Sequence, residues 1–103
     1  MNNTNIKKSF NIEEAKKIGE ELNLDFNKEP FDIEQFRKGL DVELEHGKQS
    51  SETNITNDDP ILTGKIALAH LREFPDYYTR LDKLEKQAKE YWNKYNKNII
   101  YRY

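Results

Sequence analysis

Residues 59–74, DPILTGKIALAHLREF, form the most apolar stretch of the 103-residue chain and decide how it folds. Asp59 stands where an N-cap residue belongs, and Pro60 takes the first helical position, where its missing N–H costs nothing. Pro75 ends the helix because proline disfavours helical backbone at the residue before it. The stretch therefore predicts a central helix against which the more polar segments pack.

Two further helix starts come earlier in the chain. Asn11 followed by Glu14 forms a capping-box pattern, and Asp32 followed by Gln35 repeats it. We therefore predict one helix over 12–22 and a second from residue 33, which Gly47 should end. In each helix the apolar residues recur on one face, and these are Ala15, Ile18 and Leu22, then Ile33, Phe36, Leu40 and Leu44.

A long amphipathic helix is predicted after Pro75. Its apolar positions alternate spacings of four and three: Tyr77, Leu81, Leu84, Ala88, Tyr91 and Tyr95. Residues 48–58 are polar and should form an exposed loop. We expect an all-α fold, a compact four-helix arrangement in which the third helix is central and the fourth runs along it. The chain should divide into a flexible N-terminus (1–9), a single helical domain (10–95) and a C-terminal tail (96–103).

Composition removes several classes of protein. The chain has no cysteine, which excludes disulfides, zinc thiolates and thiol nucleophiles. No run approaches the roughly 20 apolar residues that span a bilayer, and no signal peptide opens the chain, so we expect a soluble cytoplasmic protein without membrane contact. Residues 10–59 carry 14 acids and 6 bases, whereas residues 80–103 carry 7 bases and 3 acids. The two ends of the chain therefore have opposite charge.

The chain's two histidines each lie three residues from a glutamate, in mirrored order: Glu43 with His46, and His70 with Glu73. On helices this spacing puts each pair on one face. The helical projection turns His70 inward, where it needs hydrogen-bond partners. Glu43, Glu73, Tyr77 or Tyr78 could supply them and so fix how the second, third and fourth helices pack.

The same groups have two other interpretations. Ferritin-like proteins bind metals through Glu-x-x-His motifs, so Glu43, His46, His70 and Glu73 could hold a divalent metal, including that of a metal-dependent hydrolase. Acid–base catalysis would use His70 as the base. The sequence shows no nucleophile elbow, no phosphate-binding glycine loop and no HExxH motif, so an enzyme is disfavoured and we assign no catalytic residue and no cofactor.

Aromatic residues gather towards the C-terminal end. Tyr91, Trp92 and Tyr95 could pack in the core, bind a protein partner or support self-association. Together with Tyr101 and Tyr103 they also have the composition of a surface on which nucleic-acid bases stack, because basic residues are interleaved with them: Lys89, Lys94, Lys97 and Arg102. Packing or protein association is the favoured use, and a nucleic-acid-associated protein is an alternative.

The segments FRKGLDVELEHG (36–47) and TNDDPILTGKIALAHLREFPDYYTRL (56–81), with FNIEEAKKIGEELNLDF (10–26) upstream, resemble an uncharacterised domain family of bacteria, phages and large DNA viruses. The resemblance covers about residues 10–85 and implies no established activity, cofactor or partner. A viral source would place the protein in host cytoplasm or the virion. The resemblance does imply a binding site, because the matching segments contain more polar residues than a bare helical fold needs. The residues in those segments are Glu43, Glu45, His46, Asp58, Asp59, Thr63, Gly64, Lys65, His70, Glu73, Pro75, Asp76, Tyr77, Tyr78 and Arg80.

The sequence thus predicts a small, non-catalytic binding or assembly module with a polar site. Its ligand would be another protein or a small polar molecule. The residues expected to bind it are Glu43, His46, His70, Glu73, Tyr77, Tyr78 and Arg80.

Overall fold

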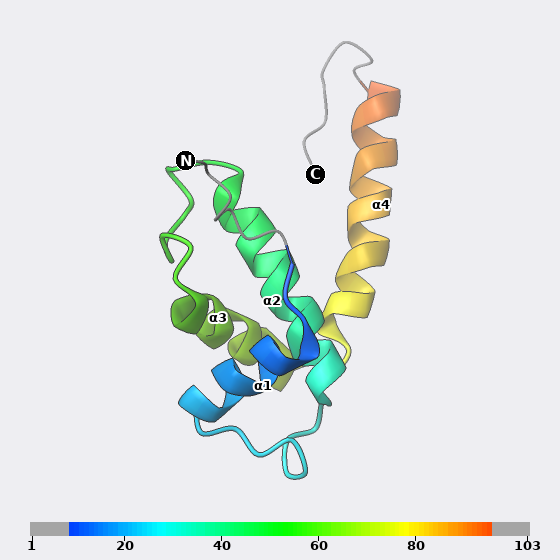
Figure 1. The fold of residues 1–103 in the computed structure, drawn as a ribbon. Helices are drawn as coiled ribbons and strands as arrows, with labels where there is room; N and C mark the ends of the chain where they lie inside the picture. Colours follow the sequence, from blue (N-terminus) through cyan, green and yellow to red (C-terminus); the bar gives the residue numbers. More distant parts are fainter. Residues whose placement is uncertain (1–8, 96–103) are drawn as a thin grey trace.

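The fold is all-α, as predicted. A computed structural model describes residues 9–95; the predictions of a flexible segment before residue 9 and of a tail after residue 95 lie outside the described residues. The helices are α1 (Ile12–Glu21), α2 (Ile33–Lys48), α3 (Pro60–Glu73) and α4 (Tyr77–Tyr95) (Figure 1). The α3 helix packs against all three other helices, and so does α2, so these two share the centre of the fold.

Side-chain caps start the first three helices as the sequence predicts. The Asn11 side chain accepts a hydrogen bond from the Glu14 N–H at 2.8 Å, and the Glu14 carboxylate accepts one from the Asn11 N–H at 3.0 Å. Asp32 accepts from the N–H of Gln35 at 2.9 Å. Asp59 accepts from the N–H groups of two residues in the first turn of α3. These bonds satisfy donors that have no partner within the helix.

The predicted end of the second helix is wrong. The α2 helix continues through Gly47 to Lys48, and Gly47 does not adopt the left-handed conformation that would end it. A Cβ at Gly47 would lie 3.0 Å from Asn54 Oδ1. Glycine therefore lets the following loop approach the helix closely. In contrast, Asn23 after α1 does adopt a left-handed conformation, with φ of 61°.

Three helices meet at Gly39. A Cβ there would lie 2.6 Å from Tyr78 Cε2 and 3.1 Å from the Cβ of Ala67, so only glycine lets α2 come this close to α3 and α4. The surrounding core joins residues from all four helices and from the segments before α1 and α2. Its buried apolar members are Phe10, Ala15, Ile18, Phe31, Phe36, Leu40, Leu44, Ala67, Leu71 and Tyr78.

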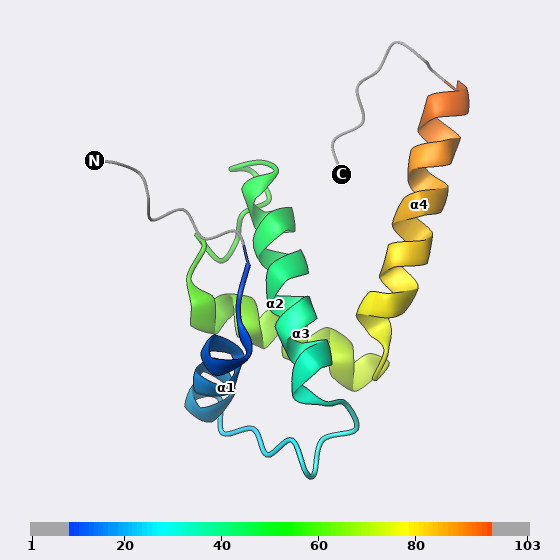
Figure 2. The same ribbon diagram turned by 45° about the vertical axis from the view of Figure 1, so that its right-hand side comes forward.

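The α4 helix does not run along α3 as expected. Its first turns pack on the core, where Tyr78 is fully buried and Tyr77 and Leu81 are partly buried. Farther along the same stripe, Leu84 is 58% exposed and Tyr95 is 72% exposed. Figure 2 shows the second half of α4 leaning away from the other helices. The predicted apolar stripe exists, but no other helix of residues 9–95 covers its outer half.

Within residues 9–95, none of the four helices combines the length and the apolar character that crossing a membrane requires.

Candidate functional site

A hydrogen bond between α2 and α4 forms the centre of the predicted polar site. The Tyr78 hydroxyl donates to Glu43 Oε2 at 2.7 Å. Tyr78 is fully buried, and this burial, together with the neighbouring Glu43 charge and the hydrogen bond to it, raises the pKa of the phenol far above its usual value. The hydroxyl therefore stays protonated and acts as a donor.

The His70 ring of α3 lies beside this pair. Its Nε2 is 3.8 Å from Glu43 Oε2, and its Nδ1 is 3.3 Å from Glu73 Oε1. The ring stacks on Tyr77 with centroids 4.3 Å apart and planes 13° apart. One third of the His70 side chain remains exposed, so the ring faces the core only in part.

Tyr77 completes the cluster and is surrounded by acids. Desolvation raises the pKa of its phenol, and the charges of Glu43, Glu73 and Glu85 raise it further. Like Tyr78, it is therefore held in the neutral form. The structure thus brings together Glu43, His70, Glu73, Tyr77 and Tyr78, drawn from three helices.

His46 takes part in a separate contact. Its Nε2 lies 2.8 Å from Glu85 Oε2 on α4, and both side chains are about three-quarters buried. The sequence interpretation missed Glu85 as a member of the site. The sequence did contain a signal that could have found Glu85: it lies seven residues after Tyr78, and this spacing puts both residues on one face of α4. This contact ties the last turns of α2 to the middle of α4.

The structure places Arg80 away from the cluster. Its Nε donates to Asp76 Oδ1 at 2.7 Å, and its guanidinium lies 4.1 Å from the centre of the Phe74 ring. The hydrogen bond from Arg80 lowers the pKa of Asp76. Arg80 therefore braces the corner between α3 and α4 at the surface.

The four candidate metal ligands do not form one site. His46 faces Glu85, whereas His70 faces Glu43 and Glu73. Across residues 9–95, no group of three or more His, Asp or Glu side chains is arranged to hold a metal ion. The contacts seen are those of a hydrogen-bonded network linking α2, α3 and α4.

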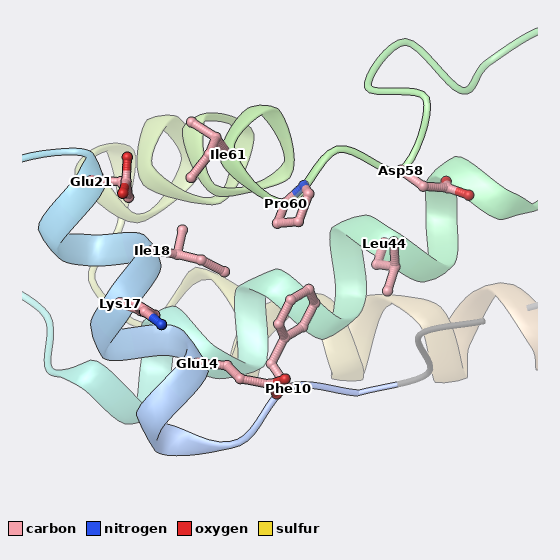
Figure 3. A pocket seen from close by; sticks show the side chains of 9 residues that line it. All are labelled: Phe10, Glu14, Lys17, Ile18, Glu21, Leu44, Asp58, Pro60 and Ile61. Atoms are coloured by element: carbon pink, nitrogen blue, oxygen red, sulfur yellow. The ribbon is translucent and has the colours of Figure 1, made fainter. Parts of the chain in front are cut away.

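The described surface has several hollows, and two of them are lined in part by α2. A cavity of about 320 Å³ beside the cluster is lined by Glu43, His46, Ile66 and residues of the loop after α2. A larger groove of about 700 Å³ lies between α1 and the start of α3 (Figure 3). Of the residues singled out from the sequence it contains Asp58, but none of the seven expected to bind the ligand. The sequence interpretation missed this groove, because it forms where residues 48 positions apart, Phe10 and Asp58, come together.

The outer half of α4 forms a third feature of the surface. Tyr91 and Tyr95 stack with ring centroids 5.6 Å apart, and Trp92 lies edge-on to both. The three side chains are 55%, 72% and 39% exposed, in the order Tyr91, Tyr95, Trp92. We call these residues, with Leu84, the outer α4 face.

The fold and these features define a small all-α domain in which a polar network holds the first half of α4, while the outer half of α4 is exposed. Residues 15–87 match the family described as "Protein of unknown function (DUF5661)". The chain belongs to this family, which confirms the resemblance to an uncharacterised domain. No curated protein and no solved structure matches the chain.

Proposed function

We propose that the protein is a small, non-catalytic binding and assembly module that recognises another protein through the outer α4 face. The observation that supports this proposal is the exposure of an apolar stripe whose first residues are buried in the protein's own core. Tyr77 and Leu81 pack on the core, whereas Leu84, Tyr91 and Tyr95 continue the stripe into solvent. Exposed aromatic side chains grouped in this way are typical of protein interfaces.

In this proposal the polar cluster positions α4. Glu43 and His46 lie one turn apart on α2 and hold Tyr78 and Glu85, which lie two turns apart on α4. Two contacts along the helix fix its direction better than one. Glu43, His46, His70 and Tyr78 therefore act as the anchor of the binding helix, and the exposed residues beyond them meet the partner.

The charge around the outer α4 face indicates the partner's chemistry. Asp82 is paired with Lys38, and Glu85 with His46. Lys86, Lys89 and Lys94 have no ion pair within residues 9–95. On the helix surface Lys94 and Lys89 flank the aromatic rings on either side, whereas Lys86 lies on the opposite side of α4. The rings with these two flanking lysines fit an apolar surface that carries carboxylates at its edge.

A designed amphipathic peptide of leucine and glutamate tests the proposal as a model partner. Trp92, the only tryptophan of the chain, reports binding by a blue shift of its fluorescence. We expect saturable binding that weakens with salt, and at least a tenfold loss of affinity in the double variant Tyr91→Ala, Tyr95→Ala.

A matched control replaces two exposed residues on the other side of α4, Lys83→Ala with Glu90→Ala, and leaves the net charge unchanged. This variant should bind the peptide like the natural chain. Equal binding by the tyrosine variant, or no binding of the peptide, would overturn the proposal. Salt-dependent binding of a DNA duplex in place of the peptide would favour the nucleic-acid alternative.

A further inference from the structure

The groove between α1 and α3 is a second feature of the described surface. Its walls Phe10, Ile18 and Leu44 are buried (6%, 7% and 2% exposed), and it opens to the surface beside Pro60 and Ile61. Figure 3 shows Phe10, Ile18, Leu44, Pro60 and Ile61 arranged around it, from the segment before α1 and from three helices. Its volume of about 700 Å³ lies within the range of cavities that bind ligands. The groove can therefore accept a large side chain.

The rim of the groove is acidic. Glu14, Glu21 and Asp58 line it, with Lys17 as the only base among its lining residues. Asp58 is held there in a left-handed backbone conformation, with φ of 64°, and accepts a hydrogen bond from Asn54 at 2.9 Å. The combination of apolar walls and the acids Glu21 and Asp58 favours a ligand that is both apolar and cationic.

We propose that this groove on one copy of the protein binds the outer α4 face of a second copy. This inference rests on the proposed function and names the partner. The outer α4 face supplies the missing properties, since Tyr91, Trp92 and Tyr95 are exposed aromatic side chains and Lys89 and Lys94 flank them on the helix surface. In such a contact the acidic part of one chain, within residues 10–59, meets the basic part of the next chain, within residues 80–103.

The contact must join different molecules. No α4 residue lines the groove, and the contacts of Tyr78 and Glu85 hold α4 against α2. Figures 1 and 2 both show the end of α4 pointing away from α1. Because each copy offers one groove and one helix, the association is head to tail and continues to larger species or closes into a ring.

Sedimentation of the full chain over a range of micromolar concentrations tests the inference with two defective variants. The helix variant is Tyr91→Ala with Tyr95→Ala. The groove variant is Glu21→Arg with Asp58→Asn, which changes the rim charge by three units and keeps a residue type that tolerates the left-handed conformation. A control variant, Glu20→Arg with Glu13→Gln, makes the same change of charge on α1 outside the groove.

We expect the natural chain and the control variant to form dimers and larger species in a salt-sensitive way. Each defective variant alone should remain a monomer. Their mixture should form a complex that stops at twice the 12.3 kDa chain mass, because only one intact groove and one intact helix face can meet. Circular dichroism of each variant checks that it folds.

The outcomes separate the two proposals. A natural chain that stays monomeric, or a groove variant that associates like the natural chain, overturns the groove inference. In the second case, loss of association in the helix variant alone would leave the proposed function standing and indicate pairing of two α4 helices. Association that survives in the helix variant would overturn the groove inference, whereas the peptide-binding test decides the proposed function separately.

Discussion

Replacing Gly39 by alanine should destabilise the protein, although the same change usually stabilises a helix. Alanine in a helix interior is favoured over glycine by about 1 kcal/mol. Here, the added methyl group would lie 2.6 Å from a ring carbon of Tyr78, which is fully buried and held by its hydrogen bond to Glu43. Overpacking of this kind costs about 1 to 3 kcal/mol. The difference between these two terms is a net loss of up to about 2 kcal/mol.

Urea denaturation followed by far-ultraviolet circular dichroism measures this change in the free energy of unfolding. Gly47→Ala serves as the matched control in the same helix. Its new methyl group would lie 3.0 Å from Asn54 Oδ1 and at the ordinary contact distance of 3.7 Å from Thr56 Oγ1, so a shift of the Asn54 side chain by a few tenths of an ångström relieves the contact. The control should be near neutral or slightly stabilising. If Gly39→Ala raised stability, or matched Gly47→Ala, the close approach of the three helices at this position would be refuted.

Four other changes have defined outcomes. Tyr78→Phe removes the donor to Glu43 and should cost about 1 to 3 kcal/mol in urea denaturation. Because the pKa of Tyr78 is raised in the folded chain, an unfolded tyrosine loses its proton first above pH 10, so the free energy of unfolding should fall with pH by up to about 1.4 kcal/mol per pH unit. Titrations on both sides of pH 10 should show a shallower fall in Tyr78→Phe. Asp59→Ala removes the cap of α3 and should cost about 1 kcal/mol in thermal denaturation. Tyr95→Ala should leave the melting temperature of the monomer unchanged, since the side chain is 72% exposed; a large decrease would show that it packs within the monomer.

Local signals predicted the helices well because the causes are local. A cap such as Asp59 acts on N–H groups two and three residues away, and the sequence displays that relation directly. The spacing of Phe36, Leu40 and Leu44 likewise identifies a buried face without knowledge of what covers it. Gly47 misled the prediction because glycine ends helices and also permits close contacts, and only the position of Asn54 separates the two uses.

The course of α4 could not be predicted for a different reason. The stripe from Tyr77 to Tyr95 has the same spacing throughout, whether a helix of the same molecule covers it or not. The buried half differs from the exposed half because the second half of α4 leans away from the other helices (Figure 2). The contact between His46 and Glu85 depends on the same packing, so the sequence could suggest each side chain but not the pair.

The attachment of α4 also makes it a lever. From Glu85, the last α4 residue tied to α2, to Tyr95 the helix extends about 15 Å. A tilt of about 10° at Glu85 would displace the Tyr95 end by about 3 Å, which approaches the distance between touching atoms. A small change in the packing around Gly39 or Glu43 would thus cause a larger displacement of the aromatic side chains on the outer α4 face. Substitutions far from those rings could therefore change the position of the surface that they form.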